Sequence, residues 1–86
     1  MQSREIEIRN PTGLHTRPGN LFVKKAKEYA SAVTVVKGEK RVNAKSLLTL
    51  MKAGISMGDR IVIVTEGPDE GRALEDLAAL VASFTE

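Results

Sequence analysis

The amino-acid sequence predicts an α+β fold in which three helices pack on one face of a four-stranded, mainly antiparallel sheet. Three features support this prediction. Apolar residues recur with the period of a strand in four segments and with the period of a helix in three. These segments follow one another in the order βαββαβα, and a chain of this order packs most simply into two layers. At 86 residues the chain can bury one modest core, so we expect residues 1–86 to form a single domain.

The first strand and the first helix are predicted on either side of a loop. Residues 4–9, REIEIR, alternate charged side chains with Ile6 and Ile8, as a half-buried strand does, and the sequence NPTG then indicates a loop. An amphipathic helix is predicted to begin directly after His15, because Pro18 is well suited to a first helical position. The apolar stripe of this helix comprises Phe22, Ala26 and Tyr29.

A hairpin and a short helix are predicted next. Residues 31–43 carry β-branched residues on both sides of a Lys-Gly-Glu-Lys turn. Ser46 then precedes the sequence LLTLM, and Gly54 lies just beyond it, so Ser46 is a suitable N-cap and Gly54 a suitable stop signal. The helix between them has fewer than two turns and needs tertiary packing to be stable. Its expected buried stripe comprises Leu47, Leu50 and Met51.

The last strand and the last helix have the strongest patterns in the chain. Residues 60–66, RIVIVTE, form the most apolar strand, which predicts a central position in the sheet. Residues 67–84 place acidic side chains in the first turn of a helix, where the helix dipole favours them. The apolar stripe of this helix comprises Leu74, Leu77, Ala78 and Val81.

Composition excludes several classes of site and of partner. The chain has no cysteine and only one histidine, which excludes disulfides, thiolate nucleophiles and a multi-histidine metal site, so we expect no metal. No apolar run approaches the roughly 20 residues that a membrane span needs, and the start is polar. The formal charge of +2 is dispersed and only three residues are aromatic, which argues against nucleic-acid binding. We expect a cytoplasmic protein that does not insert into membranes.

The single histidine lies in the stretch TGLHTRPGN, at the start of the first predicted helix. A helix N-terminus offers unpaired N–H groups and a partial positive charge to an anion, and Thr16 and Pro18 lie in the first turn of this helix. Arg17 adds a guanidinium that can hold two phosphate oxygens. Both positive charges favour the neutral, nucleophilic imidazole, so His15 could accept a phosphoryl group covalently. A site that only binds anions and a surface histidine without a role remain alternatives.

Two segments carry a resemblance to a known family. GLHTRPGNLFVKKA and VNAKSLLTLMKAGISMGD, at this separation, closely resemble the HPr family, the histidine-containing phosphocarriers of the bacterial phosphoenolpyruvate-dependent sugar phosphotransferase system. The resemblance implies an open-faced β-sandwich without a cofactor, a carrier rather than an enzyme. It implies that His15 accepts a phosphoryl group on Nδ1 from phosphorylated Enzyme I and passes it to the IIA domains of sugar permeases. Arg17 would stabilise that group.

Ser46 is predicted to cap a helix, and the resemblance adds a regulatory role. In many Gram-positive bacteria a dedicated HPr kinase/phosphorylase modifies the matching serine of the family. A phosphate at a helix N-terminus is compatible with the fold, but its charge would oppose docking to acidic partners. The alternative function is a regulatory or nitrogen-branch module that acts through the Ser46 face on a transcriptional regulator. The presence of His15 argues against a purely regulatory member.

We expect partners to dock on a small apolar patch centred on Leu48, although a core position for Leu48 is the alternative. A ring of basic side chains, Arg17 among them, would steer acidic partners toward the patch. A carrier that shows one face to many partners is expected to be a monomer. Gly19 and Asn20 replace the Ala-Ala that is usual in the family, and Gly19 is expected to loosen the helix start. The predicted partner-binding residues are Asn20, Leu21, Lys24, Lys27, Lys45, Leu47, Leu48, Met51, Lys52 and Gly54.

Overall fold

Four strands and three helices follow one another in the predicted order in the computed structural model, which describes all residues from 1 to 86. The strands are β1 (Gln2–Glu7), β2 (Ala32–Lys37), β3 (Lys40–Asn43) and β4 (Arg60–Glu66). The helices are α1 (Thr16–Ala26), α2 (Leu47–Lys52) and α3 (Glu70–Ser83).

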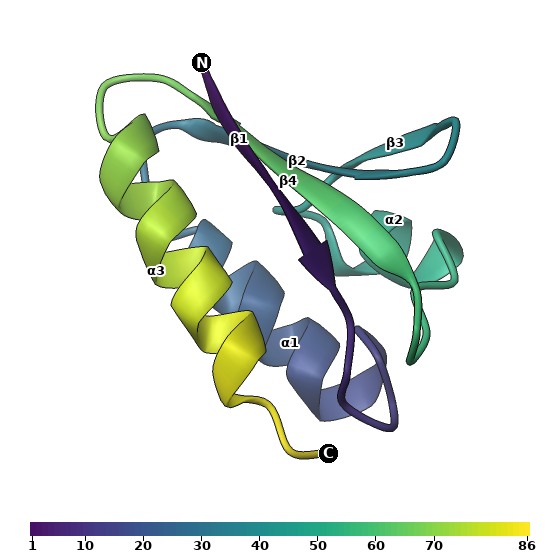
Figure 1. The fold of residues 1–86 in the computed structure, drawn as a ribbon. Helices are drawn as coiled ribbons and strands as arrows, with labels where there is room; N and C mark the ends of the chain where they lie inside the picture. The colour runs from purple at the N-terminus through teal and green to yellow at the C-terminus, as the bar shows by residue number, and fades with distance from the viewer.

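The strands form one open sheet in the order β1-β4-β2-β3, and every neighbouring pair is antiparallel. β4 lies between β1 and β2, which confirms the central position predicted from its apolar sequence. All three helices cover the same face of this sheet, and the other face is left open (Figure 1). The predicted α+β class and the open-faced sandwich are therefore confirmed.

The core lies between the sheet and the helices. β4 buries Ile61 and Ile63 and β2 buries Val33 and Val35, because alternate residues of a strand point to one face. Phe22 of α1 is fully buried against them, and the predicted stripe of α3 is buried throughout. Burying a side chain of this size contributes about 1.5–3 kcal/mol, so this layer anchors the helices that carry the site.

Three details differ from the sequence prediction. β1 begins and ends two residues earlier than predicted, because the polar Gln2 and Ser3 pair with β4 although nothing in their side chains marks a strand. Tyr29 is buried but lies beyond the last residue of α1. Met51 was expected in the buried stripe of α2 but is 39% exposed. The helix turns only Leu50 fully into the core, and Leu47 is half-buried at its edge.

None of the three helices has the length and apolar character that a membrane-spanning helix requires.

Candidate functional site

The loop before His15 is held in place by backbone groups from a distant part of the chain. The N–H of Leu14 donates to the carbonyl of Ile55 at 3.1 Å, and the N–H of Gly13 donates to the carbonyl of Asn10 at 3.1 Å. The side-chain amide of Asn10, which is nearly fully buried, donates to the carbonyl of Gly13 at 2.8 Å. The residue before His15 is thus fixed against the segment between α2 and β4.

Gly13 is required by this close approach. Its φ is +63°, and a Cβ at this position would lie 2.2 Å from the carbonyl oxygen of Ile55. Any side chain would therefore push the loop away from the Ile55 segment. That segment is itself pinned, because the Asp59 carboxylate accepts from the N–H of Ser56 at 2.8 Å and pairs with Lys37 at 2.9 Å. These two contacts lower the pKa of Asp59, the Ser56 hydrogen bond contributing most.

His15 occupies the N-cap position of α1, with extended backbone at φ −107° and ψ 166°. Leu14 and Pro18, on either side of it, are both buried, while the His15 side chain is half-buried and makes no capping hydrogen bond. The first N–H that enters the helical ladder belongs to Gly19, which donates to the His15 carbonyl at 3.3 Å. Pro18 has no N–H, and the N–H groups of Thr16 and Arg17 have no acceptor, so the first turn of α1 keeps two unpaired donors directly after His15 in the chain.

Thr16 adopts a left-handed backbone, with φ at +48°, and is the only residue other than glycine with a positive φ. This conformation is unfavourable for a β-branched residue, by roughly 1–3 kcal/mol. The buried neighbours Leu14 and Pro18 hold the chain there. The strained residue therefore lies directly next to the histidine that the sequence singled out.

Gly19 is buried and packed rather than loose. A Cβ at this position would lie 2.4 Å from the carbonyl oxygen of Leu14 and 3.8 Å from Cδ1 of Leu47. The expectation that Gly19 loosens the helix start is not supported, because this glycine lets α1 approach both the His15 loop and α2. The same contact brings the first turns of α1 and α2 together.

Arg17 points to the last residue of the chain. Its guanidinium lies 3.4 Å from the side-chain carboxylate of Glu86, and the Arg17 side chain is 73% exposed. A backbone oxygen of Glu86 accepts hydrogen bonds from the N–H and the hydroxyl of Thr12 and from the side-chain amide of Asn10. The predicted phosphate-binding arginine thus has a carboxylate partner in this structure, and that partner is solvent-exposed and replaceable.

Ser46 caps α2 as predicted. Its hydroxyl accepts from the N–H of Thr49 at 3.4 Å and lies 3.0 Å from the hydroxyl of Thr49. The N–H of Ser46 donates to the carbonyl of Asn43 at 3.2 Å. The contact between Gly19 and Leu47 therefore places the capping serine close to the start of α1.

The predicted apolar patch is exposed at three of its members. Leu48 is 67% exposed, which excludes the alternative of a core position, and Leu21 and Met51 are 42% and 39% exposed. Leu47 is half-buried and packs against the core. Asn20 is exposed beside Leu21. The structure thus leaves apolar side chains of α1 and α2 open to a partner.

The basic residues predicted to surround the patch fall into two groups, those free of contacts and those engaged within the protein. Lys24, Lys27 and Lys52 are exposed and form no ion pair. Lys45 is half-buried, and its ammonium donates to the carbonyl of Tyr29 at 2.7 Å, so it ties α2 to the end of α1. Gly54 has a φ of +66°, and its carbonyl accepts from the Lys37 ammonium at 2.7 Å. Free positive charge is therefore carried by the first three lysines.

Two supporting residues were missed by the sequence prediction. Asn10 holds both Gly13 and Glu86, and Glu86 contacts Arg17 from the far end of the chain. An Asn before Pro-Thr-Gly is a local turn signal that could have indicated the first. No local pattern could have indicated the second, because it depends on where α3 ends.

Comparison with known proteins agrees with this geometry. A family model described as the PTS HPr component phosphorylation site matches residues 2–83. The chain belongs to the HPr family. The phosphocarrier protein HPr of Borreliella burgdorferi is 44% identical over 86 residues, which covers all of both chains. An HPr crystal structure from Thermoanaerobacter tengcongensis superposes with a TM-score of 0.95 at 43% identity, over 96% of this chain and 93% of that one.

The HPr family also contains relatives of another kind. The HPr-like protein Crh of Bacillus subtilis is 43% identical over 94% of this chain and 95% of its own. Its crystal structure, described as a dimer with a swapped domain, has a TM-score of 0.77 at 41% identity, over 100% of this chain and 99% of that one. The family is one of phosphocarriers rather than catalysts, while the expected monomer is not confirmed, since a family member forms dimers.

Proposed function

We propose that this protein is a phosphocarrier that receives a phosphoryl group on His15 from phosphorylated Enzyme I. A nitrogen of the neutral imidazole forms a bond to phosphorus while the bond between phosphorus and the donor breaks, and the donor keeps the electron pair. The same steps in reverse pass the phosphoryl group to a IIA domain of a sugar permease. The carrier needs no cofactor for this, because positioning and charge supply the catalysis.

The observation that carries this proposal is the pair of unpaired N–H groups at the start of α1, directly after His15. The N–H groups of Thr16 and Arg17 have no acceptor in the protein, and both lie within two residues of His15. A phosphoryl group on His15 would bring anionic oxygens to this helix N-terminus, where N–H groups and the helix dipole stabilise negative charge. The Arg17 guanidinium would exchange its exposed carboxylate partner, Glu86, for these oxygens.

The docking surface that fits this function is the exposed apolar patch of Leu21, Leu48 and Met51, with Lys24, Lys27 and Lys52 around it. Free lysines would steer acidic partners and keep each encounter short. A carrier for such partners would act in the cytoplasm. In dilute solution we propose that it is a monomer.

The test is the intact mass of the protein after mixing with Enzyme I, magnesium and phosphoenolpyruvate. The expected result is one added, acid-labile phosphoryl group, which is absent in His15→Ala. The His15→Ala variant should fold normally, because the imidazole makes no hydrogen bond in the structure. No gain in mass, with an Enzyme I that phosphorylates a known carrier, would contradict the proposal.

Regulation through Ser46 is a second part of the proposal. Its hydroxyl caps α2 next to the start of α1, so a phosphate there would add negative charge near the proposed docking patch without displacing a core residue. Ser46→Asp should therefore slow phosphoryl transfer from Enzyme I while the thermal unfolding temperature stays close to that of the unmodified protein. An unchanged transfer rate would count against this regulatory role.

The alternative function is a regulatory module that acts through the Ser46 face, which similarity to Crh favours. The two functions differ in the mass experiment. A regulatory module would gain no phosphoryl group from Enzyme I but would gain one at Ser46 from an HPr kinase. The carrier gains one at His15, whether or not the kinase also acts.

A further inference from the structure

The open face of the sheet is more apolar at its centre than a solvent-facing sheet usually is. Residues of β4 and β2 that point away from the helices include Val62, Val64 and Val36, all half-buried, and Thr34 beside them. The exposed face of an antiparallel sheet normally alternates to polar side chains. β-branched residues favour strands in any case, so their presence alone identifies no partner.

The charges around this centre are arranged in a specific way. Strand register aligns Glu5 with Val62, Val62 with Val36, and Val36 with Arg41. One row of side chains thus crosses all four strands, from an acid on the β1 edge, through two valines, to a base on the β3 edge. We call this row the Glu5–Arg41 row.

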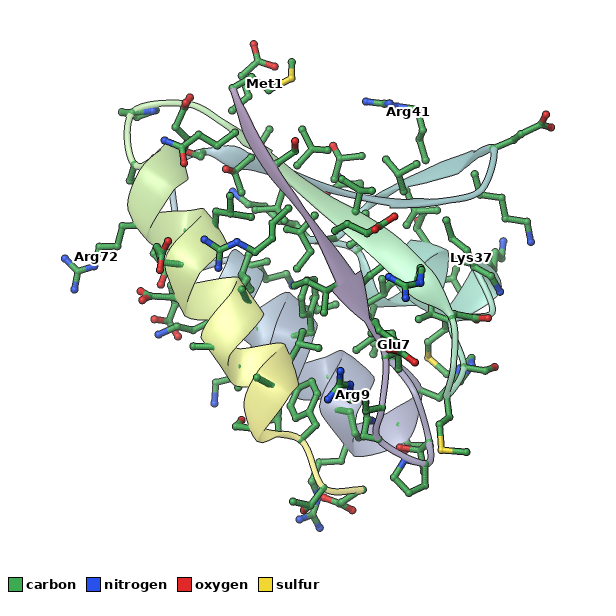
Figure 2. The ribbon with its side chains drawn as sticks, viewed as in Figure 1. Met1, Glu7, Arg9, Lys37, Arg41 and Arg72 are labelled. Atoms are coloured by element: carbon green, nitrogen blue, oxygen red, sulfur yellow. The ribbon has the colours of Figure 1, made fainter.

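Both charged ends of the row are available to a partner. Arg41 is exposed, forms no ion pair, and extends from β3 away from the helices (Figure 2). Glu5 remains 61% exposed although Arg60 lies 3.6 Å from it. Exposed pairs of this kind contribute little to stability, so Glu5 can accept a second positive charge at small cost.

From this arrangement we infer that the open sheet face binds a second copy of the same chain. A two-fold axis parallel to the strands, between β4 and β2, superimposes the β1 edge of each copy on the β3 edge of the other. It places Glu5 opposite Arg41 twice and Val62 opposite Val36 twice. A two-fold axis that runs across the strands along this row would instead place Glu5 opposite Glu5 and Arg41 opposite Arg41, so charge favours the first arrangement for this row.

The neighbouring row is compatible with the same axis. Register aligns Ser3, Val64, Thr34 and Asn43 across the four strands. The two-fold axis then places Ser3 opposite Asn43, two side chains that can hydrogen-bond, and Val64 opposite Thr34. Face-to-face packing of twisted sheets about 10 Å apart accommodates both rows.

The interface is small, and the dimer is accordingly weak. Four strands about 4.8 Å apart give a face about 19 Å wide, which belongs to the size class of transient contacts. A contact of this class is expected to form only at high protein concentration, on the order of 1 mM. His15 lies at the start of α1, in the layer on the opposite side of the sheet, so this dimer leaves it accessible.

Charge reversal at the two ends of the row tests the proposal. Sedimentation equilibrium of the intact chain up to about 1 mM should show a monomer–dimer equilibrium that weakens at high salt. Arg41→Glu and Glu5→Lys should each raise the dissociation constant at least about tenfold, because each creates two like-charge contacts. An equimolar mixture of the two variants should associate again. In the mixed dimer Glu5 of the first variant faces Arg41 of the second, and the two substituted side chains face each other with opposite charges.

Matched controls separate the effect of charge from loss of the fold. The double variant Glu5→Lys, Arg41→Glu should dimerise by itself, which a variant that had lost its fold could not do. Lys24→Glu changes the charge by the same amount as Arg41→Glu, on an exposed residue of α1, and should leave the dimer unchanged. The inference is overturned if no association is seen at about 1 mM. It is also overturned if the dimer persists in both single charge-reversal variants, as a dimer formed by strand exchange would.

Discussion

The two ends of helix α1 are built in opposite ways. At the His15 end, the N–H groups of Thr16 and Arg17 are unpaired and the backbone of Thr16 is strained. At the other end, where the chain turns into β2, the Asp69 carboxylate accepts from the N–H of Ala30 and from both the N–H and the hydroxyl of Ser31. One end leaves its N–H donors unpaired, and the other satisfies its hydrogen-bonding groups internally.

The far end is also packed more tightly. Ser31 is 1% exposed, and Gly67 approaches it so closely that a Cβ would lie 2.7 Å from the Ser31 Cα. The hydroxyl of Tyr29 donates to the Asp76 carboxylate, which ties the end of α1 to α3. Close packing and internal hydrogen bonds are therefore concentrated at the far end, while the His15 end contains strain and unpaired donors. Substitutions at the two ends should therefore affect different properties.

The largest expected effect is on stability at the far end. Gly67→Ala combines a φ of +149° with a contact to backbone that cannot move aside, and should destabilise the fold by about 3 kcal/mol. The matched control is Gly38→Ala, at φ +59° with nothing within 4 Å, which should cost about 1 kcal/mol. Urea unfolding measures both. Equal losses would contradict the tight packing of the far end.

The second effect is on function at the His15 end. Arg17→Ala should slow the gain of phosphoryl mass by about tenfold to a hundredfold, because the negatively charged phosphoryl oxygens lose the guanidinium that stabilises them. Its unfolding free energy should change by less than about 0.5 kcal/mol, since its only ion pair is exposed. Lys24→Ala removes an equal charge from the same helix and should slow transfer less. If Arg17→Ala lowered the unfolding free energy and left the transfer rate unchanged, the proposed difference between the two ends would be contradicted.

A smaller effect concerns the strain itself. Thr16→Gly should raise the unfolding free energy by about 1 kcal/mol, because glycine adopts a φ of +48° without the penalty of a β-branched residue. Thr16→Ala keeps a Cβ at this position and should gain less. Thermal unfolding of the two variants side by side decides whether Thr16 is under strain in solution, and a loss of stability in Thr16→Gly would show that it is not.

The last effect is confined to acidic pH. The hydrogen bond from the Ser31 hydroxyl, with those from the backbone, lowers the pKa of Asp69 below its ordinary value of 3.8. The unfolded chain binds this proton at higher pH than the folded one, so the stability that Asp69 provides is present above about pH 4 and is lost as the pH falls through the folded pKa. The unfolding temperature of Asp69→Asn should therefore depend less on pH between about 5 and 2. Parallel pH profiles for the two proteins would contradict it.

Much of the fold could be predicted because its signals are local. Ile61 and Ile63 alternate in β4, Leu74 and Leu77 repeat in α3, and these patterns identified the elements and their buried faces. The beginning of β1 could not be predicted, since Gln2 is polar and is a strand residue only through its pairing with Thr65. The exposure of Met51 likewise depends on how α2 packs against the core.

The position of the candidate site in the fold was predictable, and the residues that support it were not. His15, Arg17 and Pro18 belong to one short motif, and Pro18 predicted a helix start there, although α1 begins at Thr16 and Pro18 is its third residue. The carbonyl of Ile55, against which Gly13 packs, lies far along the chain and has no sequence signal. The left-handed backbone of Thr16 could not be predicted from the sequence either, because threonine rarely adopts this conformation.

The hydrogen bonds that hold the His15 loop have a consequence for protein synthesis. Three backbone N–H groups, those of Ile8, Thr12 and Leu14, donate to backbone oxygens of Asp59, Glu86 and Ile55, respectively. A nascent chain that ends before α2 contains the entire motif around His15 and none of these acceptors. Closing such long loops is slow compared with forming a helix. The loop around His15 therefore reaches its final geometry only after the segments that follow α2 have been synthesised.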